Sequence, residues 1–399
     1  MLRKVVVTKM KKIKLMNKIA AVGTDIFDRA EYEVGADLPL EEADAIMVRS
    51  AALHDTAFPA GVLAVARCGA GVNNIPVDRC AEEGIVVFNT PGANANGVKE
   101  LTVCALALAS RDIAGGIEWA SSLTGDVAAQ VEKGKSAFGG VEFAGKTLGV
   151  IGLGAIGGQV ANTALALGMK VLGFDPYLTV DAAWNLSGGI GHAKTLDEIF
   201  AAADYITLHV PAVAANRGMI NRDSIAKMKN GVRIINLARA DLAVAADIKD
   251  ALAAGRIASY VTDFPTPETV GVKGIVNIPH LGASTEESED NCAVMAARQL
   301  DDYLRTGNIR NSVNYPSVEI PMGDGTRICV LHANIPAVIA NISGVLSGYG
   351  INIENLTNKS KGDNAYTLVE TTGVLGKDVA GAVAEKIGAL DGIHRVRII

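Results

Sequence analysis

Short apolar runs alternate with helical stretches along the first hundred residues. Residues 45–48, 63–67 and 86–88 are continuous apolar runs of strand length, and 75–83 has the periodicity of a helix. Strands that alternate with helices predict a parallel sheet joined by helical crossovers. The same alternation resumes near residue 147 and continues to about residue 278. The pattern therefore predicts an α/β protein with two doubly wound parallel sheets.

Two long helical patterns and a linker divide the chain further. One helix begins near Val98 and suits a connector between domains, and another spans about 285–304. Residues 314–325 contain two prolines and two glycines with few core positions, which predicts a linker. Beyond it the order strand, helix, strand, strand, helix, strand is that of a ferredoxin-like module. These six elements are expected at residues 327–332, 337–349, 351–357, 366–372, 379–390 and 393–399.

Composition bounds the class of protein without revealing its chemistry. The chain has 399 residues, of which 49% are hydrophobic and 20% charged, so it is long enough for two or three domains and is not intrinsically disordered. The net charge of −6 gives no basic face for nucleic acid. No apolar run approaches the length of a membrane span. We therefore expect a soluble, cytoplasmic protein with neither nucleic acid nor membrane as a partner.

The cysteines and the basic N-terminus call for separate interpretations. The five cysteines lie far apart with no CxxC pair, which argues against a zinc site or a disulfide framework and favours a reducing compartment without a bound metal. No acidic residue precedes Asp25, as in a transit peptide. However, lysines interleave with β-branched residues at Val5–Val7 and Ile13. We therefore predict a short first strand with a solvated extension.

A glycine-rich loop carries the strongest chemical signal. Gly152, Gly154 and Gly157 form GxGxxG between a buried strand and a helix, the context that a dinucleotide-binding turn requires. Asp175 ends the next strand, where a carboxylate accepts hydrogen bonds from a ribose diol and repels a 2′-phosphate. NAD is therefore the expected cofactor of a Rossmann-like domain. The alternative is a glycine turn that binds no nucleotide.

A second nucleotide motif is a coincidence. Residues 140–147 (GVEFAGKT) match the GxxxxGK[ST] phosphate loop, which needs a strand before it and a helix after it. Here a turn precedes the motif and a strand follows it. We therefore do not assign a phosphate loop.

Three polar residues follow predicted strands of the second sheet. Arg239, Glu268 and His280 come after strands at 232–237, 260–262 and 274–278. Ligands of open α/β sheets bind at the carboxyl ends of strands, so the three could share one crevice. Arg can hold a carboxylate at two points, His can take a hydroxyl proton as hydride leaves carbon, and Glu can orient the imidazole. Taken singly, each could be a surface or capping residue.

The chain resembles the D-2-hydroxyacid dehydrogenase family. The resemblance rests on residues 67–101 (beginning RCGAGVNNIP), GLGAIG at 152–157, NLAR at 236–239 and PHLGAST at 279–285. It is strongest toward the branch that oxidises 3-phospho-D-glycerate with NAD, in serine biosynthesis, and carries a C-terminal ACT domain. It implies a discontinuous substrate-binding domain (1–97 and 285–315), an NAD-binding domain (98–284) and an ACT regulatory domain (326–399).

The resemblance also implies residue roles. Arg239, Glu268 and His280 match the catalytic trio, and Asp263 matches the residue that binds the nicotinamide carboxamide. Further cofactor contacts are expected at Gly152, Gly154, Ala155, Ile156, Gly157, Asp175, Val210, Pro211, Leu237, Ala238, Gly282 and Ala283. The substrate side is expected at Arg49, Ser50, Arg67, Ala70, Gly71, Asn94 and Lys99, with the amides of Ala70 and Gly71 receiving the carboxylate.

Several positions depart from the family pattern. Lys99 stands where many relatives have a small residue, and it is either an extra cation for a phosphorylated substrate or a solvent-facing helix lysine. Ala240 and Asp241 replace a glycine pair after Arg239, and Asn73 stands where Asp is common. None of these departures removes the catalytic trio.

The tail resembles ACT domains that bind serine between paired modules. His332, Asn334 and Asn352 match their ligands, although Ala337 replaces the usual glycine. The module could instead serve only oligomer contacts. We expect a homodimer or homotetramer, with L-serine as a possible effector. The remaining alternatives are a dehydrogenase of another D-2-hydroxyacid and a non-enzymatic NAD-sensing scaffold.

Overall fold

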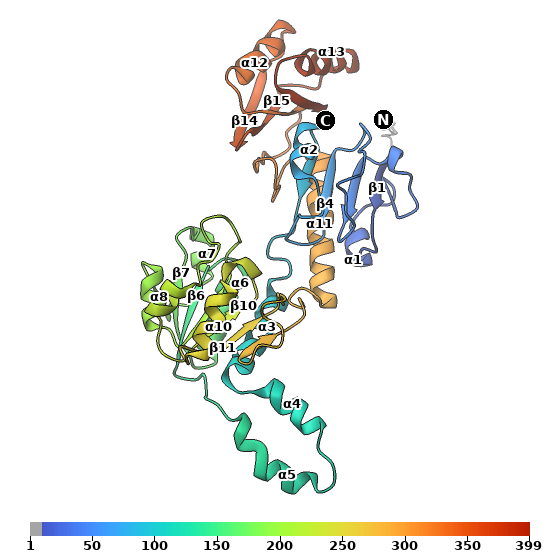
Figure 1. Ribbon diagram of the computed structural model, residues 1–399. Helices are drawn as coiled ribbons and strands as arrows, with labels where there is room; N and C mark the ends of the chain where they lie inside the picture. Colours follow the sequence, from blue (N-terminus) through green and yellow to red (C-terminus); the bar gives the residue numbers. More distant parts are fainter. Residues whose placement is uncertain (1–9) are drawn as a thin grey trace. The chain divides into compact units, whose positions relative to one another are not determined.

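The computed structural model describes residues 10–399 (Figure 1). Their contacts form two compact units, unit 1 with residues 10–93 and Glu289–Ile399, and unit 2 with Asn94–Ser288. The predicted strand residues Val5–Val7 lie outside the described residues, and the first described strand is β1 (Lys11–Leu15). Within residues 10–399, no helix combines the length and apolar character needed to cross a membrane.

The first sheet of unit 1 is parallel throughout and confirms the strands predicted there. Its order is β2-β1-β3-β4-β5, formed by β2 (Tyr32–Gly35), β1, β3 (Ala45–Val48), β4 (Ala64–Arg67) and β5 (Val86–Phe88). The sequence did not predict β2 (YEVG), because a glutamate and a glycine interrupt it and it is not a continuous apolar run like β3 and β5. The chain passes from β1 outward to β2 and then returns to β3. The loops after β1 and β3 therefore lie at the switch point, where open parallel sheets bind ligands.

Three helices accompany this sheet. They are α1 (Ala21–Thr24), α2 (Val77–Glu82) and the long α11 (Glu286–Thr306), which the sequence predicted at 285–304. α11 packs against the sheet through small side chains, and Gly23 of α1 lies so close that a Cβ there would be 2.6 Å from Ala293. Farther along α11, Tyr303 contributes a large ring, whose centre lies 5.7 Å from that of Phe88 in β5.

Unit 2 contains a seven-stranded parallel sheet. Its order is β12-β11-β10-β9-β6-β7-β8, with β6 (Thr147–Ile151), β7 (Lys170–Phe174), β8 (Ile190–His192), β9 (Tyr205–Leu208), β10 (Val232–Asn236), β11 (Ile257–Thr262) and β12 (Ile275–Asn277). The chain builds β6, β7 and β8 in one direction and then returns to β9 on the other side of β6. The carboxyl ends of β6 and β9 therefore flank a second switch point.

The helices of unit 2 include an extension that the sequence did not reveal. α3 (Ala95–Ser110) packs against the sheet, but the helix expected to run onward from Val98 ends there. α4 (Ile113–Ser121) and α5 (Val127–Gly134) follow, contain no buried residue and extend away from the rest of the unit (Figure 1). The other helices are α6 (Ala155–Ala166), α7 (Val180–Trp184), α8 (Leu196–Ala202), α9 (Arg222–Lys227) and α10 (Ala245–Ala253).

The C-terminal part of unit 1 has the six elements that were predicted. They are β13 (Arg327–Ala333), α12 (Val338–Gly348), β14 (Ile353–Lys361), β15 (Asn364–Thr371), α13 (Lys377–Gly388) and β16 (Ile393–Ile398). The sheet order is β14-β15-β13-β16 and every pairing is antiparallel. Alternate residues of β13 point to opposite faces, so Ile328 and Val330 pack with the two helices.

The other face of this sheet packs within unit 1 rather than facing solvent. Cys329 and Leu331 belong to the same core as Tyr303 and Leu304 of α11. Arg395 of β16 donates to the carbonyl oxygens of Val62 and Glu83 at 2.7 and 3.0 Å. The C-terminal module is thus packed against the first sheet of its own unit.

The segment predicted as a linker is also packed. Tyr315 and Val318 are fully buried and Ile320 is 4% exposed, so the expectation of few core residues at 314–325 is wrong. The Tyr315 hydroxyl donates to the carbonyl oxygen of Ala81 at 2.7 Å. The prolines and glycines correctly indicated that the segment has no regular helix or strand. They do not indicate whether its side chains are buried.

Candidate functional site

The glycine loop has the geometry that a close-approaching ligand requires. Gly152 has φ +90°, and a Cβ there would lie 2.5 Å from the carbonyl oxygen of His209. A Cβ on Gly157 would lie 1.9 Å from the Gly152 carbonyl oxygen, so only glycine lets α6 begin this close to β6. No atom lies within 4 Å of the Cβ position of Gly154, which leaves the N-terminus of α6 open to an anion.

Asp175 is tied to this loop by two hydrogen bonds. Its Oδ2 accepts from the Leu153 N–H and its Oδ1 from the Tyr177 N–H, both at 2.9 Å. These bonds fix the carboxylate beside the loop and leave each oxygen a further lone pair. The arrangement fits the hydroxyls of a ribose.

His209 is a residue of this region that the sequence reasoning missed. It follows β9 directly, its Nε2 lies 3.0 Å from Thr207 Oγ1, and its backbone carbonyl lies against Gly152. Burial lowers the pKa of His209 to about 4, so the imidazole is neutral at pH 7. Its position after a strand that borders β6 was the available signal.

The aromatic ring of Phe264 lies next to both Arg239 and His280. The guanidinium carbon of Arg239 is 5.7 Å from the Phe264 ring centre, and the ring centres of Phe264 and His280 are 4.6 Å apart. These residues follow β10, β11 and β12, which are neighbours in the sheet and run parallel. The predicted convergence of Arg239 and His280 is therefore present within unit 2.

Glu268 lies on the same edge but is not bonded to His280. Its side chain is exposed, and a hydrogen bond from the Thr266 side chain holds the pKa of Glu268 below its usual range. It lines a cavity of about 220 Å³ together with Phe264, Thr266 and Asp241. The expected contact between Glu268 and the imidazole is not formed in this structure.

Asp263 supplies a buried acceptor without a partner. Its side chain is 1% exposed, and its Oδ1 has no hydrogen-bond partner in the described part of the chain. Burial raises the pKa of Asp263, while the nearby His280 and Arg239 oppose that shift. An unsatisfied buried acceptor costs free energy unless a ligand donates to it. The amide group of a nicotinamide is such a donor, so this site fits NAD.

The remaining predicted cofactor residues also belong to unit 2. Ala155 and Ile156 begin α6, and the others follow the strands β9, β10 and β12: Val210, Pro211, Leu237, Ala238, Gly282 and Ala283. Asn236, which the sequence reasoning also missed, shapes the turn at Arg239. It is fully buried, its Oδ1 accepts from the N–H of Ala238 and Arg239, and its Nδ2 donates to the Arg239 carbonyl.

Most of the predicted substrate residues lie in unit 1. Arg49 and Ser50 follow β3 at the switch point, and Arg67 ends β4. Among residues 10–399, no acceptor takes a hydrogen bond from the N–H groups of Ala70 and Gly71, and a Cβ on Gly69 would collide with the Arg67 side chain. Two unpaired amides beside guanidinium groups form a suitable environment for an anion.

Asn94 and Lys99 belong to unit 2 instead. Lys99 Nζ donates to Asn96 Oδ1 at 2.5 Å and lies 3.9 Å from a carboxylate oxygen of Glu100. The lysine therefore lies along its own helix, with neighbours one turn or less away.

The predicted effector residues are separated within one chain. His332 is 2% exposed, and its Nδ1 and Nε2 lie 2.7 and 2.8 Å from Ala333 O and Thr367 Oγ1. Asn334 donates to Gly362 O, beside the turn between β14 and β15, whereas Asn352 donates to Thr372 Oγ1 at the opposite end of β15. The structure therefore brings His332 and Asn334 to one end of the sheet and Asn352 to the other.

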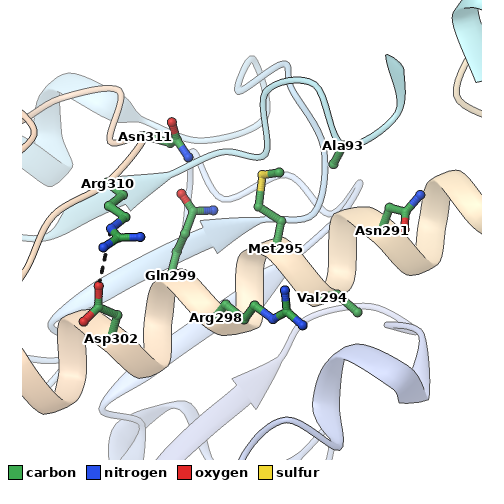
Figure 2. Close-up of a pocket in the computed structure, with 9 residues that line it drawn as sticks. All are labelled: Ala93, Asn291, Val294, Met295, Arg298, Gln299, Asp302, Arg310 and Asn311. Atoms are coloured by element: carbon green, nitrogen blue, oxygen red, sulfur yellow. Dashed lines mark ion pairs between the residues drawn. The ribbon is translucent and has the colours of Figure 1, made fainter. Parts of the chain in front are cut away.

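A separate cavity of about 670 Å³ lies on α11 in unit 1 (Figure 2). Figure 2 shows Arg310 directed toward Asp302, with which it forms an ion pair at 3.7 Å. None of the predicted site residues lines this cavity.

A parallel sheet with a glycine loop, an aspartate tied to that loop, and Arg and His after the strands on either side of β11 is typical of NAD-binding dehydrogenases. Residues 112–283 match the family model of the D-isomer specific 2-hydroxyacid dehydrogenase, NAD binding domain. The D-3-phosphoglycerate dehydrogenase of Methanocaldococcus jannaschii is 35% identical over 307 residues, which cover 72% of this chain and 56% of that protein.

A second relative and a solved structure also indicate similarity to 3-phosphoglycerate dehydrogenases. D-3-phosphoglycerate dehydrogenase 1 of Saccharomyces cerevisiae is 30% identical over 410 residues, covering 92% of this chain and 83% of that protein. The NAD-bound 3-phosphoglycerate dehydrogenase structure from Entamoeba histolytica aligns with a TM-score of 0.59 at 26% identity, covering 76% of this chain and 99% of that one. The chain belongs to the D-isomer specific 2-hydroxyacid dehydrogenase family of NAD-dependent enzymes.

Proposed function

We propose that this protein oxidises 3-phospho-D-glycerate to 3-phosphooxypyruvate with NAD, as a step of serine biosynthesis. The observation that carries the proposal is the grouping of Arg239 and His280 around Phe264, beside the unpartnered Oδ1 of Asp263. The names of the relatives favour the phosphorylated substrate. The alternative within the family is a D-2-hydroxyacid that lacks a phosphate.

Each residue of the grouping has one task. Arg239 pairs with the substrate carboxylate and sets the orientation of the carbinol carbon. His280 takes the hydroxyl proton as the hydride leaves that carbon. NAD, when bound, accepts the hydride. Glu268 remains ionised because its pKa is lowered, so it can orient the imidazole and stabilise its protonated form once the two side chains meet.

The substrate would draw its contacts from both predicted domains, 1–97 with 285–315 and 98–284. Arg49, Ser50, Arg67, Ala70 and Gly71 form its anion-binding side in unit 1. Asn94 and Lys99 are proposed contributors from unit 2. A phosphate and a carboxylate together need the cations and amides that these positions supply.

An absorbance assay for NADH tests the reaction. The wild-type protein should reduce NAD with 3-phospho-D-glycerate far faster than with D-lactate or D-glycerate. Arg49→Gln and Lys99→Gln should weaken this preference for the phosphorylated substrate. Faster turnover of an unphosphorylated acid would assign the protein to another branch of the family, and failure of every 2-hydroxyacid to reduce NAD would favour a non-enzymatic NAD sensor.

We further propose that residues 326–399 form a ferredoxin-like ACT domain whose effector is L-serine. The element order and antiparallel sheet support this assignment. Because Asn334 and Asn352 lie at opposite ends of the sheet, a site that uses both must form between two copies of the chain. This favours a homodimer or homotetramer.

A serine titration tests this regulation. Serine should inhibit the wild-type protein, and Asn352→Ala should raise the serine concentration required. A wild-type rate that is unchanged at millimolar serine would leave the module with a role in oligomer contacts only.

A further inference from the structure

The backbone around Arg49 is held by an unusually complete set of hydrogen bonds. The Oδ1 of Asn17, on the loop after β1, accepts from the N–H groups of Arg49, Ser50 and Ala51 at 3.2, 3.1 and 2.9 Å. Asn74 Nδ2 donates to the carbonyl oxygen of Ala51 at 2.8 Å, and Arg67 Nε donates to that of Arg49 at 3.1 Å. The origin of the Arg49 side chain is therefore fixed before any ligand arrives.

The guanidinium group at the end of this side chain is already paired with a carboxylate. Arg49 Nη1 lies 2.6 Å from Glu289 Oε2, in the first turn of α11. The side chains are 37% and 42% exposed, so water screens the pair and it contributes little to folding. Another anion can therefore replace Glu289 on the Arg49 guanidinium at a small cost in free energy.

We propose that Glu289 tunes the affinity for phosphorylated ligands by competing with the substrate's distal anionic group for Arg49. This inference rests on the proposed function, in which Arg49 binds that group. A phosphate dianion presents more charge and more acceptor oxygens than one carboxylate, so it can replace Glu289 on the guanidinium fork. A substrate without a second anionic group cannot make this exchange.

The exchange has a consequence for affinity. Glu289 neutralises Arg49 in the free protein, and its negative charge remains near the ligand after displacement. Both effects weaken the binding of phosphorylated ligands and favour their release. Glu289 thus sets the KM for a phosphorylated substrate rather than taking part in proton or hydride transfer.

The test compares Glu289→Gln with the wild-type protein and with Glu287→Gln. Glu287 is an exposed carboxylate two residues earlier in the same helix, so its replacement removes one charge but leaves the Arg49 pair intact. Calorimetric titration with inorganic phosphate should show roughly fivefold tighter binding to Glu289→Gln and little change for Glu287→Gln. The KM for 3-phospho-D-glycerate should fall by a similar factor, while the KM for D-glycerate should change much less.

A double variant isolates the interaction. In the Arg49→Gln background, Glu289→Gln should no longer tighten phosphate binding by more than Glu287→Gln does. Phosphate binding that is unchanged or weaker in Glu289→Gln would overturn the proposal, and weaker binding would show that Glu289 orients Arg49 for the ligand instead.

The two hypotheses fail separately. If the wild-type protein does not oxidise 3-phospho-D-glycerate, the proposed function fails, but phosphate binding still decides the role of Glu289. If the wild-type protein does oxidise it and Glu289→Gln binds phosphate no more tightly, only the competition fails.

Discussion

Arg327 and Glu370 form an ion pair at 3.4 Å in which both side chains are almost completely shielded from solvent. Arg327 also donates to the carbonyl oxygens of Thr306 and Pro321, at 2.8 and 2.6 Å. Glu370 Oε1 accepts from the Gly323 N–H at 2.5 Å. The pair therefore joins the C-terminal sheet to the end of α11 and to the segment between them.

Breaking this pair should strongly destabilise unit 1. Glu370→Gln leaves the Arg327 charge buried without a counter-charge, and we expect the free energy of unfolding to fall by about 3 kcal/mol. Urea titration followed by circular dichroism measures the change. Replacing both residues by apolar ones, Arg327→Met with Glu370→Leu, should recover most of the loss; a Glu370→Gln protein as stable as the wild type would show that the pair contributes nothing.

Ala337 adopts a backbone conformation that normally requires glycine. Its φ and ψ are +67° and −1°, in the left-handed region, directly before α12. A Cβ there costs roughly 1 kcal/mol, so Ala337→Gly should stabilise the protein by up to that amount. Ala340→Gly, at an exposed position in the first turn of α12, is the matched control and should lose up to about 1 kcal/mol. Thermal unfolding measures the stability of both variants. If Ala337→Gly also lowers stability, the backbone of Ala337 is not strained.

His209 should make folding stability depend on pH. Its pKa falls from the ordinary value of 6.5 to about 4 on folding, so between these values the unfolded chain binds more protons. Stability therefore rises with pH across this window and is lost as pH falls below 6.5. The loss between pH 7 and pH 5 should be roughly 2 kcal/mol. His209→Gln should reduce this difference in urea titrations at the two pH values; an unchanged difference would assign the dependence to other groups.

His280 should affect turnover but not cofactor binding. His280→Ala removes the proposed base, and we expect the turnover number to fall by roughly 10²–10⁴-fold. Calorimetric titration with NAD should give an affinity close to that of the wild-type protein, because Asp263 and the glycine loop remain. Undiminished turnover would remove His280 from the mechanism. Asp263→Ala provides the reciprocal case, with weakened NAD binding expected from loss of the buried acceptor.

The sequence predicted most reliably those features that depend on residues close together in the chain. Gly152 and Gly157 must be glycine because neighbouring backbone leaves no room for a Cβ, and their spacing is visible in the chain. The strands β3 and β5 were predicted because parallel strands covered on both faces are apolar throughout. The six C-terminal elements were predicted because stretches with strand patterns and stretches with helix patterns follow one another along the chain.

Contacts between distant residues could not be predicted in this way. Asn17 and Asn74 resemble ordinary loop residues, and only the packed sheet shows that they hold the Arg49 loop. The Arg49–Glu289 pair joins residues 240 positions apart. Residues 314–325 have the composition of an exposed linker, yet Tyr315 is fully buried because the first sheet and the C-terminal module enclose it.

The sequence by itself determined the two parallel sheets, the C-terminal module, the NAD loop and the alignment of Arg239, Glu268 and His280 with strand ends, since each depends on periodicity or on spacing along a few elements. Only the tertiary structure decided which of these side chains meet. It placed Arg239 and His280 around Phe264, left Glu268 apart, separated Asn334 from Asn352 and paired Arg49 with Glu289. The reason is physical: side-chain encounters depend on strand order and helix packing, which bring together residues that are remote in the chain.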